Sequence, residues 1–415
     1  MPLTYVLIGA GLAGAHAAQA IRERDAEGRI IVVGAEAEPP YNRPDLSQGY
    51  LLGTRPVEEV YWRPEGFYQD QRIELILDDC AEQLDADRRT VTLEGGRMLQ
   101  YDRLLLAMGG RACNLEQVPG SNLANIYTLR TLADATALRN AAPGAQRAVV
   151  VGGGFIAAEA GAALTRLGLR VTLVFPEDTL LQRALGDLAG RWLGDYFTAR
   201  GVTLVPRAQV AAFVGADQAL RAVALGSGRE VPADLAVLGV GITLNTRLAE
   251  QAGLELDRGL GGGVVVDAYL RTARPEIYAA GDIAAFDSTV YQRRMRLEHW
   301  DHACRSGQTA GHNMAGAEES YAELPRFCLN AFDLNVEAYG DLCQWDEVLP
   351  RVPLEPGDGQ PALVLFYLQR SVLKGALVIN PPERYLEPVQ LLLKMKPMLT
   401  AADRERLADP GAPIA

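Results

Sequence analysis

The chain has 415 residues, of which 48% are hydrophobic and 22% are charged, and its formal net charge is −12. This length exceeds one ordinary hydrophobic core, so we expect two or three domains. The acidic balance argues against a general nucleic-acid-binding protein. No uncharged apolar stretch reaches the roughly 18 residues of a membrane span, so no membrane association is expected. The five cysteines form no CxxC pair and no metal-ligand spacing, which predicts reduced thiols, no metal site and a cytoplasmic location.

The first motif in chain order is the run Gly-Ala-Gly-Leu-Ala-Gly at residues 9–14. It follows a short apolar strand predicted at residues 5–8 and opens an alanine-rich helix. In this strand–turn–helix context the glycines permit a tight turn, and backbone N–H groups approach a pyrophosphate that the helix N-terminus stabilises. The motif therefore predicts a dinucleotide site.

A second motif of the same kind, Gly-Gly-Gly-Phe-Ile-Ala, occupies residues 152–157 after an apolar strand at residues 148–151. Two such motifs predict two dinucleotides, and the economical interpretation is one flavin and one nicotinamide. Before this motif, apolar runs predict strands at residues 30–33, 90–93 and 103–108, followed by a crossover at 126–139. After the motif they predict a strand at 170–175, a helix at 184–200 and further strands up to residue 241.

Beyond residue 242 the chain is expected to return to the first domain, with strands at 263–266 and 276–282. The second of these ends in Gly281-Asp282, where an aspartate can bind the ribityl or pyrophosphate end of a flavin. The last part has hairpin-like strands at 362–368 and 372–379 and a helix at 386–396. We therefore predict an α/β fold with an FAD-binding domain (1–121 and 243–324), an NAD-binding domain (122–242) and a C-terminal α+β domain (325–415).

Five segments together resemble the FAD-dependent pyridine nucleotide–disulfide oxidoreductase superfamily. They are PYNRPDLS at 40–47, residues 151–159, residues 278–283, LEHWD at 297–301 and RLADP at 406–410. Across essentially its whole length the chain is similar to the branch that holds the putidaredoxin, rubredoxin and dioxygenase ferredoxin reductases and apoptosis-inducing factor. The resemblance implies a glutathione-reductase-like pair of Rossmann-type domains, the cofactors FAD and NADH, a ferredoxin as partner, and a monomer or homodimer.

The resemblance also assigns the FAD contacts. Ala13 would lie at the pyrophosphate turn, Glu36 or the backbone near Ala35 at the adenosine ribose, and Asp282 at the ribityl chain. Arg43 and Arg130 would meet the phosphates or the adenine end, with ordinary surface ion pairs as the alternative. The full set is Gly9, Gly11, Ala13, Gly14, Ala35, Glu36, Arg43, Gln48, Ala81, Ala107, Gly109, Arg130, Gly281, Asp282, Glu298, His299 and Trp300, with Trp300 at the isoalloxazine edge.

The nicotinamide coenzyme is assigned to the second motif. Phe155 would shield the flavin face until nicotinamide displaces it, and Glu159 would face nicotinamide or flavin N5. Glu177 would bind the ribose 2′-OH and repel a 2′-phosphate, which favours NADH, with a solvated loop carboxylate as the alternative. The set is Gly152, Gly154, Phe155, Ile156, Glu159, Glu177 and Gly241.

Three residues depart from the pattern of that branch, and the mildest departure is Met108, where threonine is usual. Gln48 stands where relatives usually have a lysine that reaches flavin N5, and a neutral amide cannot form an ion pair with Glu159. The only three lysines, Lys374, Lys394 and Lys396, lie in the last domain. Cys328 stands where many relatives have a tryptophan near the flavin, so it is either packing or an opening to another acceptor. The candidate catalytic residues are Gln48, Phe155, Glu159 and Cys328.

These patterns lead us to expect an NADH-dependent FAD oxidoreductase of the ferredoxin–NAD(+) reductase type, which passes electrons to a [2Fe–2S] ferredoxin of an oxygenase system. One alternative is a slow NADH oxidoreductase with a binding role, like apoptosis-inducing factor. Another is a pathway-specific flavoenzyme with an atypical acceptor, which Gln48 and Cys328 allow. The basic run at residues 293–296 is the candidate docking surface for an acidic ferredoxin.

Overall fold

The computed structural model describes residues 2–351, 362–380 and 385–414. Packing divides the chain into two compact units. Unit 1 contains residues 1–44, 56–111 and 242–323, and unit 2 contains residues 45–55, 112–241 and 324–415. The short segment Asp45–Arg55 therefore packs with unit 2, although it lies within the predicted FAD-binding domain. The predicted boundaries between three domains remain a prediction.

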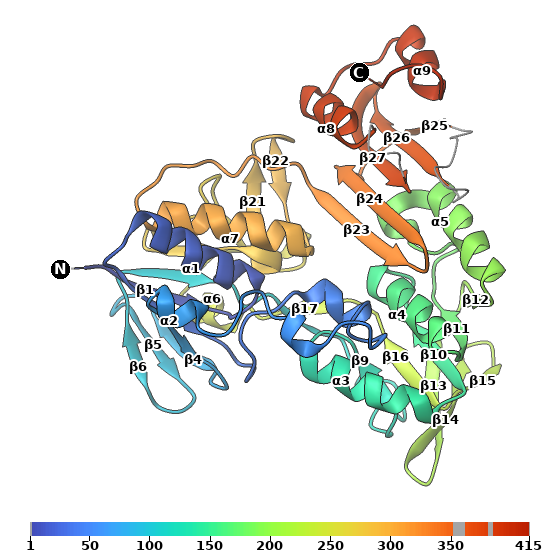
Figure 1. Cartoon of the computed structure of the whole chain (residues 1–415), viewed down its shortest axis with the longest axis horizontal. Helices are drawn as coiled ribbons and strands as arrows, with labels where there is room; N and C mark the ends of the chain where they lie inside the picture. The colour runs from blue at the N-terminus through green and yellow to red at the C-terminus, as the bar shows by residue number, and fades with distance from the viewer. Residues whose placement is uncertain (1, 352–361, 381–384, 415) are drawn as a thin grey trace. The chain divides into compact units, whose positions relative to one another are not determined.

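Unit 1 is built on a parallel sheet with the strand order β20-β7-β1-β2-β3. Its central strands are continuous apolar runs because a parallel sheet is covered on both faces. Helices α1 (Leu12–Arg24) and α7 (Trp300–Met314) lie side by side in this unit (Figure 1). The strands are β1 (Thr4–Ile8), β2 (Arg29–Val33), β3 (Ile73–Ile76), β7 (Arg103–Leu106) and β20 (Ile277–Ala279).

Glycines allow α1 and α7 to approach closely. A Cβ added at Gly307 would lie 2.2 Å from the carbonyl oxygen of Ala13, and one at Gly311 would lie 2.4 Å from that of Ala17. The rest of unit 1 comprises two small sheets, β4-β5-β6 and β18-β19-β21-β22, and the short helices α2 (Phe67–Asp70) and α6 (Arg247–Gln251). Their strands are β4 (Ala81–Asp85), β5 (Thr90–Leu93), β6 (Met98–Gln100), β18 (Leu256–Asp257), β19 (Gly263–Val266), β21 (Ala284–Ser288) and β22 (Arg293–Met295).

Unit 2 repeats the parallel plan in the sheet β12-β11-β10-β16-β9. A three-stranded antiparallel sheet, β13-β14-β15, is packed on it through a shared apolar cluster. The elements are β9 (Ile126–Thr128), α3 (Leu132–Ala141), β10 (Arg147–Val151), α4 (Phe155–Arg166), β11 (Arg170–Val174), α5 (Gln182–Ala199), β12 (Thr203–Val205), β13 (Val210–Ala216), β14 (Ala219–Leu225), β15 (Glu230–Pro232) and β16 (Leu235–Leu238).

Helix α5 covers the span predicted as a helix, but Gly186 interrupts it with φ 77° and ψ 174°. A Cβ at Gly186 would lie 2.5 Å from Cζ2 of Trp345, so the break leaves room for that indole ring. Only glycine adopts this backbone conformation without strain. The interruption therefore serves packing with the C-terminal part of the same unit.

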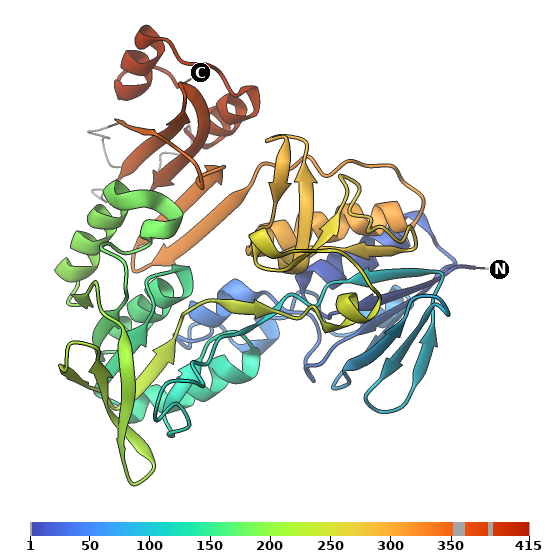
Figure 2. The same cartoon turned by 180° about the vertical axis from the view of Figure 1, so that it is seen from behind.

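The C-terminal part of unit 2 is an antiparallel sheet, β23-β24-β27-β26-β25, with α8 and α9 packed on it (Figures 1 and 2). Arg351 at the end of β25 is 0% exposed and donates to the carbonyl oxygens of Leu407 and Pro410 at 3.0 and 3.2 Å, and also to that of Ala412. The elements are β23 (Arg326–Ala331), β24 (Leu334–Gly340), β25 (Glu347–Arg351), β26 (Leu363–Gln369), β27 (Val372–Ile379), α8 (Leu386–Met395) and α9 (Ala401–Ala408).

Two further strands, β8 (Gly110–Ala112) and β17 (Ile242–Leu244), pair where the chain passes from one unit to the other. The strands predicted with bounds in both parallel sheets begin within one residue of these bounds. The segment predicted as a crossover at 126–139 begins with a strand, β9, and β3 was not predicted. Among the described residues, none of the helices has the length and hydropathy needed to cross a bilayer.

Candidate functional site

The first glycine-rich turn joins β1 to α1. A Cβ at Gly9 would lie 2.3 Å from the carbonyl oxygen of Ala107, and one at Gly14 would lie 2.0 Å from the carbonyl oxygen of Gly9. Gly9 also has φ +117°. The turn therefore requires glycine at both positions. Gly11 differs, because a Cβ there would meet nothing within 4 Å.

The start of α1 leaves its backbone donors available to a ligand. Gly11 is the N-cap and provides no side-chain cap, and the first turn contains no acidic residue. The first N–H groups of a helix lack intrahelical partners and favour an anion. Ala13, which was predicted at the pyrophosphate turn, is buried here against Gly281, whose added Cβ would lie 3.2 Å from that of Ala13. Unit 1 thus has an open, anion-favouring turn beside Gly281-Asp282.

Glu36 lies just beyond β2 in a polar cluster. Tyr41 donates to Glu36 Oε2 at 2.6 Å, and Arg43 donates to Oε1 at 3.0 Å. Burial opposes the charge of Arg43, but the neighbouring Tyr41, Glu36 and Asp282 raise its pKa. Glu36, Arg43 and Asp282, which the resemblance assigns to FAD, are therefore electrostatically coupled in unit 1.

The segment before α7 supplies the remaining predicted residues of unit 1. His299 is the N-cap of α7, and its Nδ1 accepts from the backbone N–H of Asp301 at 3.3 Å. The rings of His299 and Trp300 lie 5.5 Å apart. Glu298 is exposed and pairs with Arg296 at 2.7 Å. The side chains of His299 and Trp300 are partly exposed, so both are accessible to a ligand.

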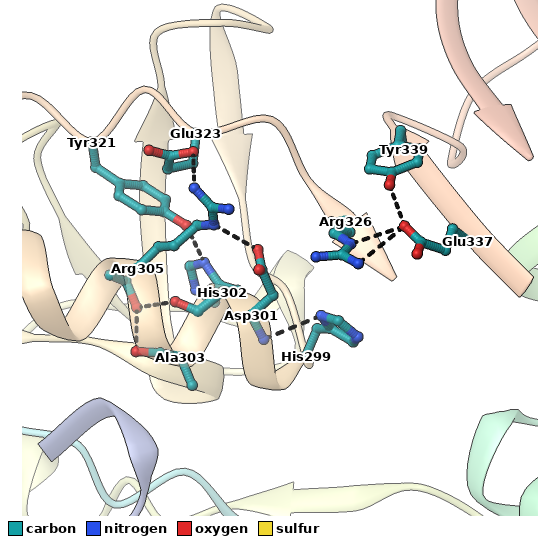
Figure 3. A network of polar contacts seen from close by, with 11 residues as sticks. His299, Asp301, His302, Ala303, Arg305, Tyr321, Glu323, Arg326, Glu337 and Tyr339 are labelled. Atoms are coloured by element: carbon teal, nitrogen blue, oxygen red, sulfur yellow. Dashed lines mark hydrogen bonds and ion pairs between the residues drawn. The ribbon is translucent and has the colours of Figure 1, made fainter. Parts of the chain in front are cut away.

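A polar network fixes the first turns of α7 (Figure 3). Arg305 bridges Asp301 at 2.9 Å and Glu323 at 2.8 Å. The buried His302 contacts the hydroxyl group of Tyr321 through Nδ1 at 2.7 Å, and burial lowers the pKa of His302 to about 4. These contacts hold the N-terminus of α7 rigidly beside Asp282, which is itself buried.

The second turn joins β10 to α4 on the same plan. Gly152 has φ +127°, and a Cβ there would lie 2.2 Å from the carbonyl oxygen of Gly239. Gly154 is an open N-cap with no side-chain cap, no acidic residue follows in the first turn, and a Cβ would meet nothing within 4 Å. The predicted Ile156 is 42% exposed beside it, and Gly241 is likewise open with φ +99°. This turn also presents free backbone donors to an anion.

Glu177 lies against this turn, as predicted from its position after β11. A Cβ at Gly153 would be 3.3 Å from Glu177 Oε2, and Arg183 pairs with Oε1 at 2.6 Å. The Glu177 side chain is 16% exposed, whereas that of Arg183 is 81% exposed. The carboxylate therefore faces the turn, and a solvated cation supports it from outside.

Glu159 on α4 is the centre of a buried polar cluster in unit 2. Its Oε1 accepts from Gln48 Nε2 and from the backbone N–H of Asn330, both at 3.1 Å, and its Oε2 accepts from the Ser47 hydroxyl group. Glu159 is 6% exposed, and burial raises its pKa to about 7 against the opposing effect of these three hydrogen bonds. The structure therefore brings together the predicted Gln48 and Glu159.

Phe155 opens α4 and stacks on Phe327 of β23, with ring centroids 6.2 Å apart and an interplanar angle of 9°. Phe155 is only partly buried, so part of its surface remains accessible. The predicted Cys328 follows Phe327 and pairs in register with Glu337 of β24. The thiol of Cys328 is partly buried and is not part of a disulfide.

Four more of the residues predicted for FAD are Ala35, Ala81, Gly109 and Arg130. Ala81 begins β4, Ala35 is exposed after β2, and Gly109 follows β7 with φ +54°. Arg130 belongs to unit 2, where it precedes the N-cap of α3 and its backbone N–H donates to Asp134 at 3.0 Å. These contacts do not by themselves indicate a ligand.

The basic run at residues 293–296 forms β22 and its continuation. Arg294 pairs with Asp287 at 3.1 Å and with Asp257 at 3.7 Å, and Arg296 pairs with Glu298. Local carboxylates therefore offset two of the three arginines, which leaves little net positive charge for an acidic partner.

The residues present fit two dinucleotides. Gly11 and Gly154 are open, uncapped helix starts, and a carboxylate follows the strand next to each turn, Glu36 after β2 and Glu177 after β11. Ser47 and Asn330 were not predicted as site residues. The motif around residues 40–47 pointed to Ser47 only as part of a loop, and Asn330 lies too far along the chain for any local pattern to indicate its contact with Glu159.

Comparisons with known proteins confirm the family. Residues 3–307 match the family described as pyridine nucleotide-disulphide oxidoreductase. The chain is 34% identical to the 5,5′-dehydrodivanillate O-demethylase ferredoxin reductase subunit of Sphingobium sp. strain SYK-6, over 99% of this chain and 97% of that protein. It is 36% identical to the anthranilate 1,2-dioxygenase system ferredoxin–NAD(+) reductase component of Burkholderia cepacia, over 81% of each protein.

Among solved structures, the ferredoxin reductase for the CYP199A2 system of Rhodopseudomonas palustris superposes with a TM-score of 0.92 at 29% identity, covering 99% of this chain and 98% of that one. This likeness confirms the predicted α/β fold with two dinucleotide-binding domains and a C-terminal domain. The chain belongs to the pyridine nucleotide–disulphide oxidoreductase family and, within it, to the ferredoxin reductase branch.

Proposed function

We propose that the protein is an NADH-dependent FAD oxidoreductase that passes electrons to a [2Fe–2S] ferredoxin as the reductase component of an oxygenase system. The observation that carries this proposal is the match over nearly the full length of both chains to a ferredoxin reductase subunit of an O-demethylase. A second relative is a ferredoxin–NAD(+) reductase component of a dioxygenase system. Both glycine-rich turns of this chain are open, as such an activity requires.

The residues that would hold FAD are in unit 1. The start of α1 at Gly11 would receive the pyrophosphate, Glu36 and Arg43 would orient the adenosine half, and Asp282 would bind the ribityl chain. Bound FAD would accept two electrons from NADH and release them singly. Because the protein supplies orientation and electrostatics rather than the redox chemistry, these contacts decide whether the cofactor stays bound.

The residues that would hold NADH are in unit 2. The start of α4 at Gly154 would receive the pyrophosphate, and Glu177 would accept a hydrogen bond from the ribose 2′-OH. The carboxylate of Glu177 would repel a 2′-phosphate at the same position, which favours NADH over NADPH. The partly exposed Phe155, stacked on Phe327, presents an apolar face at the helix start.

We further propose that the protein works in the cytoplasm. All five cysteines lie in the described residues and none forms a disulfide, which suits a reducing compartment, and NADH is a cytoplasmic coenzyme. Cell fractionation should place the activity with cytoplasmic markers, and recovery with periplasmic markers would contradict this assignment.

The test is reconstitution of electron transfer with the purified protein. It should be yellow with about one FAD per chain, NADH should bleach the flavin, and a [2Fe–2S] ferredoxin should accelerate NADH-dependent reduction of cytochrome c. A colourless protein that does not take up FAD would overturn the proposal. If the flavin is reduced by NADH but every ferredoxin tried leaves cytochrome c reduction unchanged, the acceptor is a different one.

A further inference from the structure

The carboxyl group of Glu159 receives two kinds of hydrogen-bond donor at its two oxygen atoms. Oε1 accepts from Gln48 Nε2 and from the Asn330 backbone N–H, and both groups can only donate. Oε2 accepts from the hydroxyl group of Ser47, which can either donate or accept. A proton on Oε2 is therefore accommodated when the Ser47 hydroxyl group rotates, and both contacts at Oε1 remain.

The position of Gln48 is fixed by a further contact. Asn330 Nδ2 lies 3.5 Å from Gln48 Oε1, so the side-chain amide of Gln48 presents its NH₂ group to Glu159. A proton on Oε1 would face two donors without an acceptor, which disfavours that site. Oε2, beside Ser47, is thus the oxygen that can gain and lose a proton without disturbing the cluster.

Within the part of the chain that the structure describes, the groups that bond Glu159 are an amide, a hydroxyl group and a backbone N–H, and all three are uncharged. Burial and the three hydrogen bonds account for the shifted pKa of Glu159. The elements packed around α4 are β10, β11, β16, β23 and the Asp45–Arg55 segment. Their charged groups are Asp45, paired with Arg55; Arg147, paired with Asp234; Arg326, paired with Glu337; and the exposed Arg170.

We propose that Glu159 holds, at Oε2 and beside the Ser47 hydroxyl group, the proton that remains when the electrons of NADH leave for a one-electron acceptor. The balance is NADH plus two oxidised ferredoxins giving NAD⁺, one H⁺ and two reduced ferredoxins. One proton must therefore leave the protein in each turnover. The claim that the proton comes from NADH rests on the proposed function. The claim that Glu159 binds the proton rests on the hydrogen bonds within unit 2. Ser47 acts through Glu159 and is a positioning residue.

The test is infrared spectroscopy of the FAD-loaded protein. A carbonyl band of a protonated carboxylic acid should titrate with a midpoint of about 7 and should be lost in Glu159→Gln. In reduced-minus-oxidised difference spectra, the same band should change when a ferredoxin removes the electrons. A band that is absent from about pH 5 to about pH 9, or one that is indifferent to electron removal, would overturn the proposal.

Three variants separate the role of Ser47 from a general effect on packing. Ser47→Ala should raise the midpoint by about one pH unit because the charged form loses its stronger hydrogen bond, and Ser47→Thr should restore it. Gln48→Lys should lower the midpoint by about one to three units because a cation beside Glu159 favours the carboxylate. Ser288→Ala, which alters another buried serine in unit 1, should leave the midpoint unchanged.

The two proposals fail separately. If NADH reduces the flavin and ferredoxin accepts the electrons while Glu159 shows no acid band, the proton assignment is wrong and the function stands. If the band titrates as expected but ferredoxin accepts no electrons, the proposed function is wrong and the redox-linked part of the proton assignment falls with it. An unchanged midpoint in Ser47→Ala would remove Ser47 from the assignment.

Discussion

The two glycine-rich turns share a backbone plan but differ in how their surroundings hold a polar group. In unit 1, Glu36 beyond the second strand is held by both Tyr41 and Arg43. In unit 2, Glu177 is held by Arg183, which is almost fully solvated. Under the proposed function, the first arrangement suits a cofactor that stays bound, and the second suits a coenzyme that must exchange in every turnover.

The helices that follow the turns differ as well. Counted from the first glycine of each motif, His16 occupies the position in α1 that Glu159 occupies in α4. Burial lowers the pKa of His16 to about 4, with the Arg63 charge acting in the same direction, and burial raises that of Glu159 to about 7. His16 therefore stays neutral near pH 7, whereas Glu159 titrates there. The same backbone position carries an inert group in one unit and a titratable group in the other.

The largest expected effect is the loss of cofactor binding when a side chain is introduced into each glycine-rich turn. Gly11→Val and Gly154→Val add a side chain whose Cβ would meet no protein atom within 4 Å, in extended backbone that valine tolerates. Gly11→Val should weaken FAD binding by about 100-fold, and Gly154→Val should keep FAD but weaken NADH binding by a similar factor. FAD content after gel filtration and NADH titration of the flavin spectrum measure the two effects.

Gly144→Val is the matched control, because Gly144 is equally open but lies outside both turns. It should retain FAD and bind NADH normally. If Gly11→Val bound FAD as well as the wild-type protein while Gly154→Val lost it, the assignment of the two turns would be reversed.

A smaller effect concerns stability and pH. The folded protein holds a proton on Glu159 between pH 4.5 and about 7, where the unfolded chain has lost it, so this group makes stability fall as pH rises. His16 makes stability rise with pH between about pH 4 and pH 6.5, because in this range the unfolded chain binds the proton and the folded protein does not. Each effect amounts to at most about 3 kcal/mol across its window.

Glu159→Gln and His16→Phe should remove the two opposing slopes one at a time. Unfolding in urea, measured at several pH values from about 5 to about 7, should show the Gln variant gaining stability with rising pH relative to the wild type. The Phe variant should lose stability with rising pH by the same comparison. Parallel curves for all three proteins would show that neither group is shifted in the folded state.

The smallest effect concerns coenzyme choice. Glu177→Arg removes the carboxylate that faces the second turn and leaves Arg183 without its ion-pair partner, so two cations can meet a 2′-phosphate. The preference for NADH should fall by about tenfold in stopped-flow flavin reduction, a change of about 1.4 kcal/mol. Glu230→Arg, an exposed change of the same charge on β15, should not alter the preference. A wild-type preference for NADPH would exclude Glu177 from the ribose site.

The sequence was sufficient to predict the central strands of both parallel sheets and both turns, but not β3, and it predicted a crossover where β9 lies. Strands such as β1 and β10 are continuous apolar runs that end at a glycine turn, so their ends are set by local patterns. The sequence excluded an ion pair between Gln48 and Glu159 but did not predict the hydrogen bond that joins them in the structure. The assignment of individual residues to FAD and NADH remains a prediction.

Other features depend on contacts that no local pattern records. Asn330 reaches Glu159 through a strand of the C-terminal sheet, and the break at Gly186 exists because Trp345 packs there. The partners of Arg294 and Arg296 are carboxylates from other strands and from a neighbouring loop, which a run of basic residues does not reveal. The sequence therefore predicts the order of strands and helices better than it predicts the net charge of a surface.

The buried guanidinium group of Arg351 has a consequence for anyone who engineers this protein. Its N–H groups donate hydrogen bonds to the carbonyl groups of Leu407, Pro410 and Ala412. Residues 407–412 therefore take the place of water around a buried charge. Removing residues 407–412 would leave the Arg351 charge buried without these acceptors, which should lower the free energy of unfolding by about 3–5 kcal/mol. A purification tag is therefore better placed at the N-terminus, and a library of shortened variants should end after residue 412.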